Sequence, residues 1–247
     1  MWSGVESMHK RNYREDTIHI ASLRETTAAA LLLASGFNSF NSTKEQVLCD
    51  PMTGSGTLLL EASLILCNTA PGLLYYGHSN IDISPSCAPP RYMTWLDNCN
   101  RIDLWDKTWE NANSMDKRKE LNDIGEPVLF GNDIHFGAIE LAKSSSRKLG
   151  VSNLIHWSHQ DITKYKQPRH ANTIITNPPW NLRLKEGAEE SWMKLGNFLN
   201  DANSENMWTL TGSPELVISL KEQGLQPIEQ IAFSASGTQM RFIKYIK

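Results

Sequence analysis

The sequence lacks the marks of several protein classes. Its four cysteines form no Cys-x-x-Cys pair and its seven histidines show no metal-ligand spacing, so we expect no metal, no zinc site and no disulfide framework. The N-terminus does not have the pattern of a signal peptide. The longest apolar run, Leu58 to Cys67, contains Glu61 and is too short to span a bilayer. We therefore expect an intracellular protein with reduced thiols and no membrane association, in a compartment that the sequence does not specify.

An excess of positive charge is also missing. The chain of 247 residues has a formal net charge of −3 and a pI of about 6.2. A protein with this charge does not attract nucleic acid by its overall field, so any RNA contact would need a local patch or a second module. The hydrophobic content of 40% and the charged content of 21% are typical of a globular domain with a proper core.

Apolar runs that end at glycine or polar residues predict alternating strands and helices. Strands are predicted at 46–49, 128–131, 153–157, 173–176 and 207–211, and helices at 58–66, 136–149, 189–199 and 214–223. Such alternation predicts a parallel, doubly wound sheet. Two last strands, 228–233 and 240–246, flank a turn and predict a hairpin with one antiparallel strand. The expected fold is therefore α/β: a Rossmann-like, seven-stranded class I methyltransferase sheet rather than a dinucleotide dehydrogenase.

Two further regions complete the predicted organisation. Residues 1–45 are interpreted as a basic segment and a capping helix, which starts at a capping box formed by Ser22 and Glu25 and ends at Gly36. Residues 46–247 form the main domain. Within it, residues 73–127 are interpreted as an insertion, part loop and part helix.

The insertion carries three tryptophans. Trp95, Trp105 and Trp109 are expected to fold down on the body of the protein, although they could instead stack on nucleobases.

A glycine-rich turn lies between the first strand of the main domain and the helix that follows it. Its sequence is Asp50-Pro51-Met52-Thr53-Gly54-Ser55-Gly56-Thr57. Glycines without a Cβ allow a tight turn and let a nucleotide-like ligand approach the backbone at a helix N-terminus. The candidate ligand-binding residues here are Asp50, Thr53, Gly54, Gly56 and Thr57. Alone the signal is weak, because many α/β folds have such a turn.

Two acids follow the next two strands. Asp133 stands at the end of the second strand, where a carboxylate can accept both hydroxyl hydrogens of a ribose. Asp161 follows the third strand, where an acceptor can meet an adenine amino group. Both have simpler interpretations: Asp133 could cap the following helix, and Asp161 could be an ordinary loop carboxylate.

The stretch Asn177-Pro178-Pro179-Trp180 follows the fourth strand. The Asn177 side-chain oxygen and the Pro178 carbonyl can each accept a hydrogen of an exocyclic amine. This pairing would aim its lone pair at a methyl donor. Pro179 stiffens the turn, and Trp180 offers a flat face for a flipped base. An ordinary strand-ending turn is the alternative. Together with the glycine turn and Asp133, this stretch predicts S-adenosylmethionine-dependent methylation of an exocyclic or amide nitrogen.

A cluster of cations lies near the N-terminus. Lys10, Arg11 and Arg14 could form a basic lip that touches phosphate oxygens, or they could belong to a solvated surface segment.

Several segments, in order, resemble one family. They are Ser7 to Arg14, Leu23 to Thr26, Asp50 to Ala62, Ala70 to Leu73 and Asn177 to Pro179. Together they are similar to the THUMP-associated RNA guanine-N2 methyltransferases, in particular to the bacterial-type enzyme that makes N2-methylguanosine in large-subunit ribosomal RNA. The resemblance implies that Gly54, Gly56, Asp133 and Asp161 bind S-adenosylmethionine. It also implies that Asn177 to Trp180 present a guanine amine, with ribosomal RNA a more probable substrate than tRNA.

The sequence departs from the family pattern in three places. After the Asn-Pro-Pro-aromatic stretch the family usually has Gly-Glu-Arg-Leu. Here Leu182 replaces the acid, while Arg183 is retained as a candidate RNA contact. His135 stands where a second acid is common. The family carries an RNA-binding THUMP domain upstream, and this sequence begins at the segment that would follow it. RNA docking is therefore expected to come from such a domain, outside this sequence, or from a protein partner.

Two alternatives remain open, and a third is disfavoured. Adenine N6 or a protein glutamine amide would suit the same motif. A non-catalytic subunit for RNA binding or assembly would keep the fold. A nicotinamide dehydrogenase is disfavoured by the glycine spacing.

Overall fold

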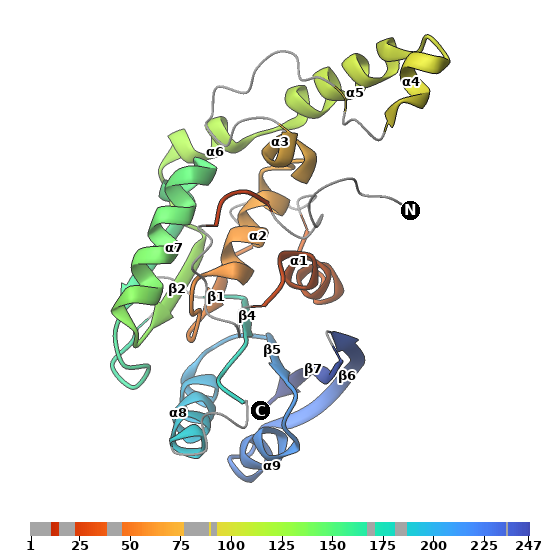
Figure 1. The fold of residues 1–247 in the computed structure, drawn as a ribbon. Helices are drawn as coiled ribbons and strands as arrows, with labels where there is room; N and C mark the ends of the chain where they lie inside the picture. The colour runs from red at the N-terminus through yellow and green to blue at the C-terminus, as the bar shows by residue number, and fades with distance from the viewer. Residues whose placement is uncertain are drawn as a thin grey trace.

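The structure is a computed structural model that describes residues 11–14, 23–38, 46–76, 89, 93–166, 171–180, 187–235 and 237–247. A seven-stranded sheet forms its centre, with the strand order β3-β2-β1-β4-β5-β7-β6. The strands are β1 (Leu48–Asp50), β2 (Leu129–Asp133), β3 (Ile155–His159), β4 (Thr173–Thr176), β5 (Asn206–Thr211), β6 (Gln226–Ala235) and β7 (Thr238–Ile246). Figure 1 shows the chain from its first helix to the terminal hairpin.

The pairing of the strands confirms the predicted fold class. The first five strands pair in parallel, while β7 runs antiparallel between β5 and β6. Every residue of β1 and β2 is buried, as expected for parallel strands covered by helices on both faces. This mixed sheet with a terminal hairpin is the class I methyltransferase arrangement.

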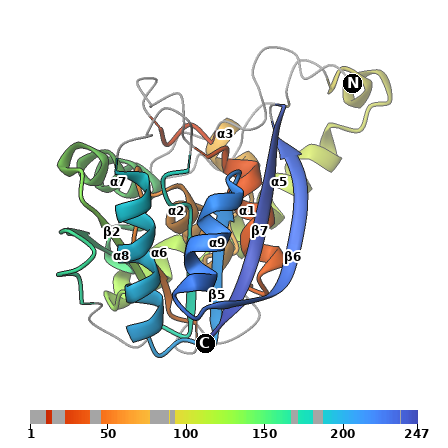
Figure 2. The ribbon, with the colours of Figure 1, turned by 90° about the horizontal axis from the view of Figure 1, so that it is seen from below.

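Helices cover the sheet on both faces. The helices on one face are α1 (Glu25–Ala34), α2 (Thr57–Leu66) and α7 (Phe136–Leu149), and those on the other are α8 (Ala188–Asp201) and α9 (Pro214–Glu222). Each face has its own apolar core. Leu59 and Trp208 lie in the first core, and Leu195 and Tyr245 lie in the second. Helices α8 and α9 lie side by side (Figure 2).

The insertion is helical in the part that the structure describes. Its helices are α3 (Pro71–Tyr76), α4 (Trp95–Asn98), α5 (Ile102–Met115) and α6 (Arg118–Ile124), and α4 and α5 extend away from the body (Figure 1). Trp109 is buried as expected and stacks on Trp105, with ring centroids 6.0 Å apart. Trp95, however, is 51% exposed. The insertion is therefore a projecting arm that only partly packs on the sheet domain.

Helix α1 begins differently from the prediction. Arg24 occupies its N-cap position without a side-chain cap, and Ser22 lies outside the described residues. Glu25 pairs instead with Arg14, whose Nε lies 3.4 Å from its Oε1. Gly36 has φ of +84° just after the helix, as expected for a residue that ends it.

A buried polar cluster joins the N-terminal segment to α2. The Tyr13 hydroxyl donates to Glu61 Oε1 at 2.9 Å, and Arg11 Nη2 lies 3.4 Å from Oε2 of the same carboxylate. Burial raises the pKa of Glu61, and the charge of Arg11 opposes that rise. Arg14 donates to the Thr57 hydroxyl. The two arginines therefore hold α1 and α2, and each has only 11% of its side chain exposed.

Glu61→Ala is expected to lower the free energy of unfolding by about 3 kcal/mol, because it removes the carboxylate that Tyr13 and Arg11 share inside the protein. Urea unfolding followed by circular dichroism measures the change. Glu222→Ala is the matched control, since Glu222 is exposed near the end of α9. Equal unfolding midpoints for the two variants would show that the cluster contributes no stability.

Candidate active site

The four predicted site stretches meet at one edge of the sheet. The glycine turn follows β1, Asp133 ends β2, Asp161 comes two residues after β3, and Asn177 follows β4. These strands are parallel, so their carboxyl ends share an edge. The strand order reverses between β1 and β4, and ligands of open α/β sheets bind at such a switch point. The topology therefore places the predicted residues where this fold class binds its ligands.

Asp133 ties the glycine turn to the end of β2. Its Oδ2 accepts the Gly54 N–H at 2.7 Å, and its Oδ1 accepts the His135 N–H at 2.8 Å. The side chain is 8% exposed. A carboxylate has about four acceptor positions, so these two bonds leave capacity for a ligand diol. Asp133 therefore positions the turn and keeps acceptor capacity beside it.

Asn132 is a supporting residue that the sequence analysis missed. Its Nδ2 donates to the Pro51 carbonyl at 3.2 Å and to the Gln160 carbonyl at 3.1 Å, while its Oδ1 accepts the Gln160 N–H at 3.1 Å. It is 1% exposed and joins the loops that follow β1 and β3. A signal existed, because a polar residue directly before a strand-ending acid is unusual in a fully buried strand.

The two glycines of the turn have different reasons to be glycine. Both have positive φ, +55° at Gly54 and +81° at Gly56. A Cβ on Gly54 would meet nothing within 4 Å, so this position faces open space. A Cβ on Gly56 would lie 2.5 Å from the Trp157 ring and 3.0 Å from the Ala142 Cβ. Gly56 thus serves the packing of α2 on α7 and β3, whereas Gly54 leaves room for a ligand.

The side chain of Asp50 is buried inside the glycine turn rather than exposed on its surface. It is 1% exposed, and its Oδ1 accepts the Met52 N–H at 3.2 Å. Burial raises the pKa of Asp50 to about 7; the Thr176 hydroxyl is the largest of the opposing influences, and Asp133 adds to the rise. In this conformation Asp50 holds the turn through its bond to the Met52 N–H. Its contact with a cofactor remains a prediction.

Asp50→Asn is expected to remove a pH dependence of stability. Because its folded-state pKa of about 7 lies above the ordinary 3.8, the protonated carboxyl contributes stability fully below pH 3.8, and this contribution is lost as pH rises through 7. From pH 5 to pH 8 the wild type should lose roughly 2 to 3 kcal/mol relative to the variant. Urea unfolding at the two pH values measures this difference. Parallel pH profiles for the two proteins would contradict the assignment.

Two large apolar side chains are exposed beside Asp133. Ile134 is 56% exposed and Phe136 is 61% exposed. The Phe136 ring meets the His159 ring at 5.5 Å in an edge-to-face arrangement. The sequence analysis did not select them, although apolar residues directly after a strand-ending acid are a usable signal. They offer apolar surface for a planar ring next to Asp133, the predicted acceptor of a ribose.

Both carboxylate oxygens of Asp161 have hydrogen-bond partners within the protein. Its Oδ1 accepts from both the N–H and the hydroxyl of Thr163, at 2.9 and 2.8 Å, and its Oδ2 lies 3.1 Å from Lys194 Nζ on α8. The Thr163 bonds, followed by the one from Lys194, lower the pKa of Asp161 to about 2. It is partly exposed at the sheet edge. The structure thus gives it a loop-fixing role, and its predicted contact with adenine remains a prediction.

The Asn-Pro-Pro-Trp stretch is held by indole groups. The Trp180 Nε1–H donates to Asn177 Oδ1 at 2.8 Å, and the Trp192 Nε1–H of α8 donates to the Pro179 carbonyl at 2.6 Å. Pro178 is buried, while Asn177 and Trp180 are half-buried. Trp180 thus contacts, through its N–H, the oxygen predicted to hold the substrate amine, and its role as a flat face for a base remains a prediction.

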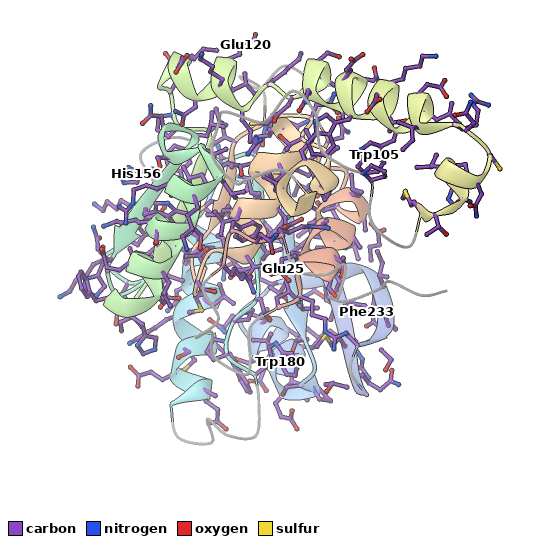
Figure 3. All side chains as sticks on the ribbon, turned by 45° about the horizontal axis from the view of Figure 1, so that its top comes forward. Glu25, Trp105, Glu120, His156, Trp180 and Phe233 are labelled. Carbon is purple, nitrogen blue, oxygen red and sulfur yellow. The ribbon has the colours of Figure 1, made fainter. Side chains whose placement is uncertain are left out.

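The predicted RNA contacts have different outcomes. Lys10 and Arg183 lie outside the described residues. Arg11 and Arg14 are mostly covered and pair with Glu61, Glu25 and Thr57, so their guanidinium groups serve packing in this structure. Trp105 on the arm lies at the end of the molecule opposite to Trp180 (Figure 3). Base stacking by this tryptophan at the site is therefore disfavoured.

Two kinds of feature are absent from the described part of the chain: clustered metal ligands and long apolar helices. There, no three histidine, cysteine or acidic side chains gather as a metal site would require. Among the same residues, no helix combines the length and apolarity needed to cross a bilayer.

Comparison with known proteins gives the family. The model of the UPF0020 family, described as the RMKL-like methyltransferase domain, matches residues 11–214. A possible methylase from Clostridium difficile 630 is 26% identical with a TM-score of 0.68, and the match covers 96% of this chain and 55% of that one. SMU.472, a putative methyltransferase solved in complex with SAH, is 20% identical with a TM-score of 0.72, and the match covers 96% of this chain and 55% of that one. TrmN from Thermus thermophilus is 18% identical with a TM-score of 0.56, and the match covers 92% of this chain and 50% of that one.

The chain therefore spans about half the length of these three structures. The family match covers most of the chain and confirms the resemblance that its motifs indicate. This protein belongs to the RMKL-like methyltransferase domain family, and its fold is that of the S-adenosylmethionine-dependent class I methyltransferases.

Proposed function

We propose that this protein transfers a methyl group from S-adenosylmethionine to the exocyclic N2 of a guanosine in RNA, with ribosomal RNA preferred to tRNA as substrate. One observation carries the proposal. The turn held by Asp133 and the indole-held Asn177 stretch follow strands β1 and β4, which are neighbours at the switch point of the sheet. A methyl donor and an amine acceptor must meet in this way.

The residues at the sheet edge fit S-adenosylmethionine. Gly54 faces open space, where the methionine end would lie against the turn. Asp133 keeps acceptor capacity for the ribose hydroxyls, and Ile134 and Phe136 expose apolar surface for the adenine ring. Asp161 would contribute its remaining acceptor capacity to the adenine amino group. When bound, the cofactor supplies an electrophilic methyl group, and the protein supplies its orientation.

Asn177 and Pro178 would position the acceptor. The lone pair of an exocyclic amine is conjugated to the base, so the amine is a weak nucleophile. Oδ1 of Asn177 and the carbonyl of Pro178 can each accept one amine hydrogen, which favours a pyramidal nitrogen with its lone pair directed at the methyl. Oδ1 already accepts the Trp180 N–H, but an amide oxygen has two lone pairs. Both contacts can therefore be made at once.

RNA docking is proposed to need more than this chain. Its net charge is −3, and the arginines of the N-terminal segment are paired with carboxylates. Neutralised phosphates dominate RNA affinity, so the chain alone should bind RNA weakly. A THUMP domain or a protein partner would supply the missing contacts.

The choice of guanine rests on the sequence resemblance, and nucleoside analysis tests it. RNA from cells lacking the gene should lose one N2-methylguanosine, and the wild-type gene should restore it, whereas the Asn177→Ala gene should not. Loss of N6-methyladenosine instead would favour the adenine alternative. An unchanged nucleoside profile, with methylated glutamine also unchanged, would favour a non-catalytic subunit.

A further inference from the structure

The indole of Trp180 fixes the orientation of the Asn177 amide. An indole N–H is a donor only, so it can pair with the oxygen of an amide and not with its NH2 group. The 2.8 Å bond from Nε1 to Oδ1 therefore selects one of the two amide orientations. In the opposite orientation, the NH2 group of Asn177 would meet the indole N–H, and it would offer donors to a substrate amine that also needs acceptors.

The indole of Trp180 packs against Gly212, and this contact surface is called the seat of the ring. A Cβ built on Gly212 would lie 2.3 Å from Cζ3 and 2.8 Å from Cε3 of Trp180, so the ring rests directly on the backbone after β5. The φ of Gly212 is outside the left-handed region, so the backbone itself does not require glycine. The absence of a side chain at position 212 is therefore explained by the space that the Trp180 ring occupies. The Thr211 hydroxyl accepts the Ser213 N–H at 2.9 Å and donates to the Ser213 carbonyl at 3.1 Å, which fixes the chain around the seat.

Trp192 of α8 makes a second contact with the stretch. Its side chain is 7% exposed, and its Nε1–H reaches the Pro179 carbonyl at 2.6 Å. Consecutive prolines have no backbone N–H, so a bond to a carbonyl is the available way to anchor this turn. Gln223, at the end of α9, donates in turn to the Trp192 backbone carbonyl at 3.4 Å.

We propose that Gly212 and Trp192 are positioning residues for methyl transfer, and that the Trp180 N–H keeps the Asn177 oxygen directed toward the substrate amine. Gly212 acts through Trp180, and Trp192 acts through Pro179. The inference rests on the proposed function, because it assigns how that site holds its acceptor. It predicts that rate, rather than cofactor binding, depends on residues that need not touch either reactant.

Gly212→Ala should lower kcat about 100-fold, because the added methyl displaces the indole and frees the Asn177 amide to rotate. Trp180→Phe keeps an aromatic face but removes the N–H, so it should lower kcat more than it raises KM. If Trp180 acted only as a stacking platform, the same variant would raise KM more than it lowers kcat. Since both changes break the same bond, the double variant should be little slower than either single variant.

Gly137→Ala is the matched control, because Gly137 lies on α7 with open space around its missing Cβ. A rate for Gly212→Ala equal to that of the control would overturn the proposal. So would strictly additive losses in the double variant.

A second measurement does not depend on the substrate. The indole N–H proton resonance of Trp180, assigned by its loss in Trp180→Phe, should shift in Gly212→Ala toward that of a solvent-exposed indole. An unchanged resonance would show that Gly212 does not seat the ring. If the wild-type protein methylates no RNA guanosine but the resonance does shift, the proposed function fails while the seat stands.

Discussion

Replacing Asn177 by alanine is expected to slow methyl transfer by about 100-fold or more while cofactor binding is unchanged. The variant loses the oxygen that would accept an amine hydrogen, and it also loses the partner of the Trp180 N–H. Asn177 follows β4 and is proposed to hold the acceptor amine rather than the turn that Asp133 holds, so the cofactor contacts should survive. Single-turnover methylation of guanosine-containing RNA measures the rate, and calorimetry with S-adenosylmethionine measures binding.

Asn177→Asp is the informative companion variant. Aspartate retains an acceptor oxygen for the Trp180 indole and another for the substrate, so part of the activity should remain. Full activity in Asn177→Ala would disprove the proposed role of this residue. Loss of cofactor binding in the same variant would show that the stretch shapes the whole site and not only the acceptor half.

Asp133→Ala should weaken S-adenosylmethionine binding by roughly 100-fold, which corresponds to about 3 kcal/mol, the value of one strong charge-assisted hydrogen bond or two weaker ones. The carboxylate would bind the ribose hydroxyls, and it also holds the Gly54 and His135 N–H groups. Both losses act in the same direction. Calorimetric titration with the cofactor and with its demethylated product measures the change.

Asp133→Asn separates the two contributions. Its remaining oxygen can still hold the Gly54 N–H, whereas the negative charge and one acceptor are lost. An affinity between those of wild type and Asp133→Ala is the expected outcome. Wild-type affinity in Asp133→Ala would remove the ribose assignment and leave Asp133 as a fold-supporting residue.

The sheet could be predicted because each strand carries a local signal. An apolar stretch ends at a polar or glycine residue in several of them, and the strand at Thr173–Thr176 has the predicted bounds. The register of the parallel strands then brings their carboxyl ends together without further information. This is why Asp133 and Asn177 could be selected from the sequence as members of one site.

The supports of the site could not be predicted in the same way, because they depend on contacts between distant segments. Gly56 is glycine because of Trp157, which lies on β3, and Gly212 is glycine because of Trp180. No local pattern indicates either pair. Arg11 and Arg14 show the same limit: a run of cations suggests a solvated surface until the carboxylates of Glu61 and Glu25 are placed against them.

The buried cluster around Tyr13 has a mechanical consequence. Tyr13 is fully buried, and Arg14 contacts Thr57, the first residue of the helix that follows the glycine turn. Residue 11, the first described residue, is therefore fixed near the helix that starts at Thr57. If RNA were held by a module joined to the chain at this point, its effective concentration at the site would be raised. RNA held by such a module would search only a small volume before its target base met Asn177.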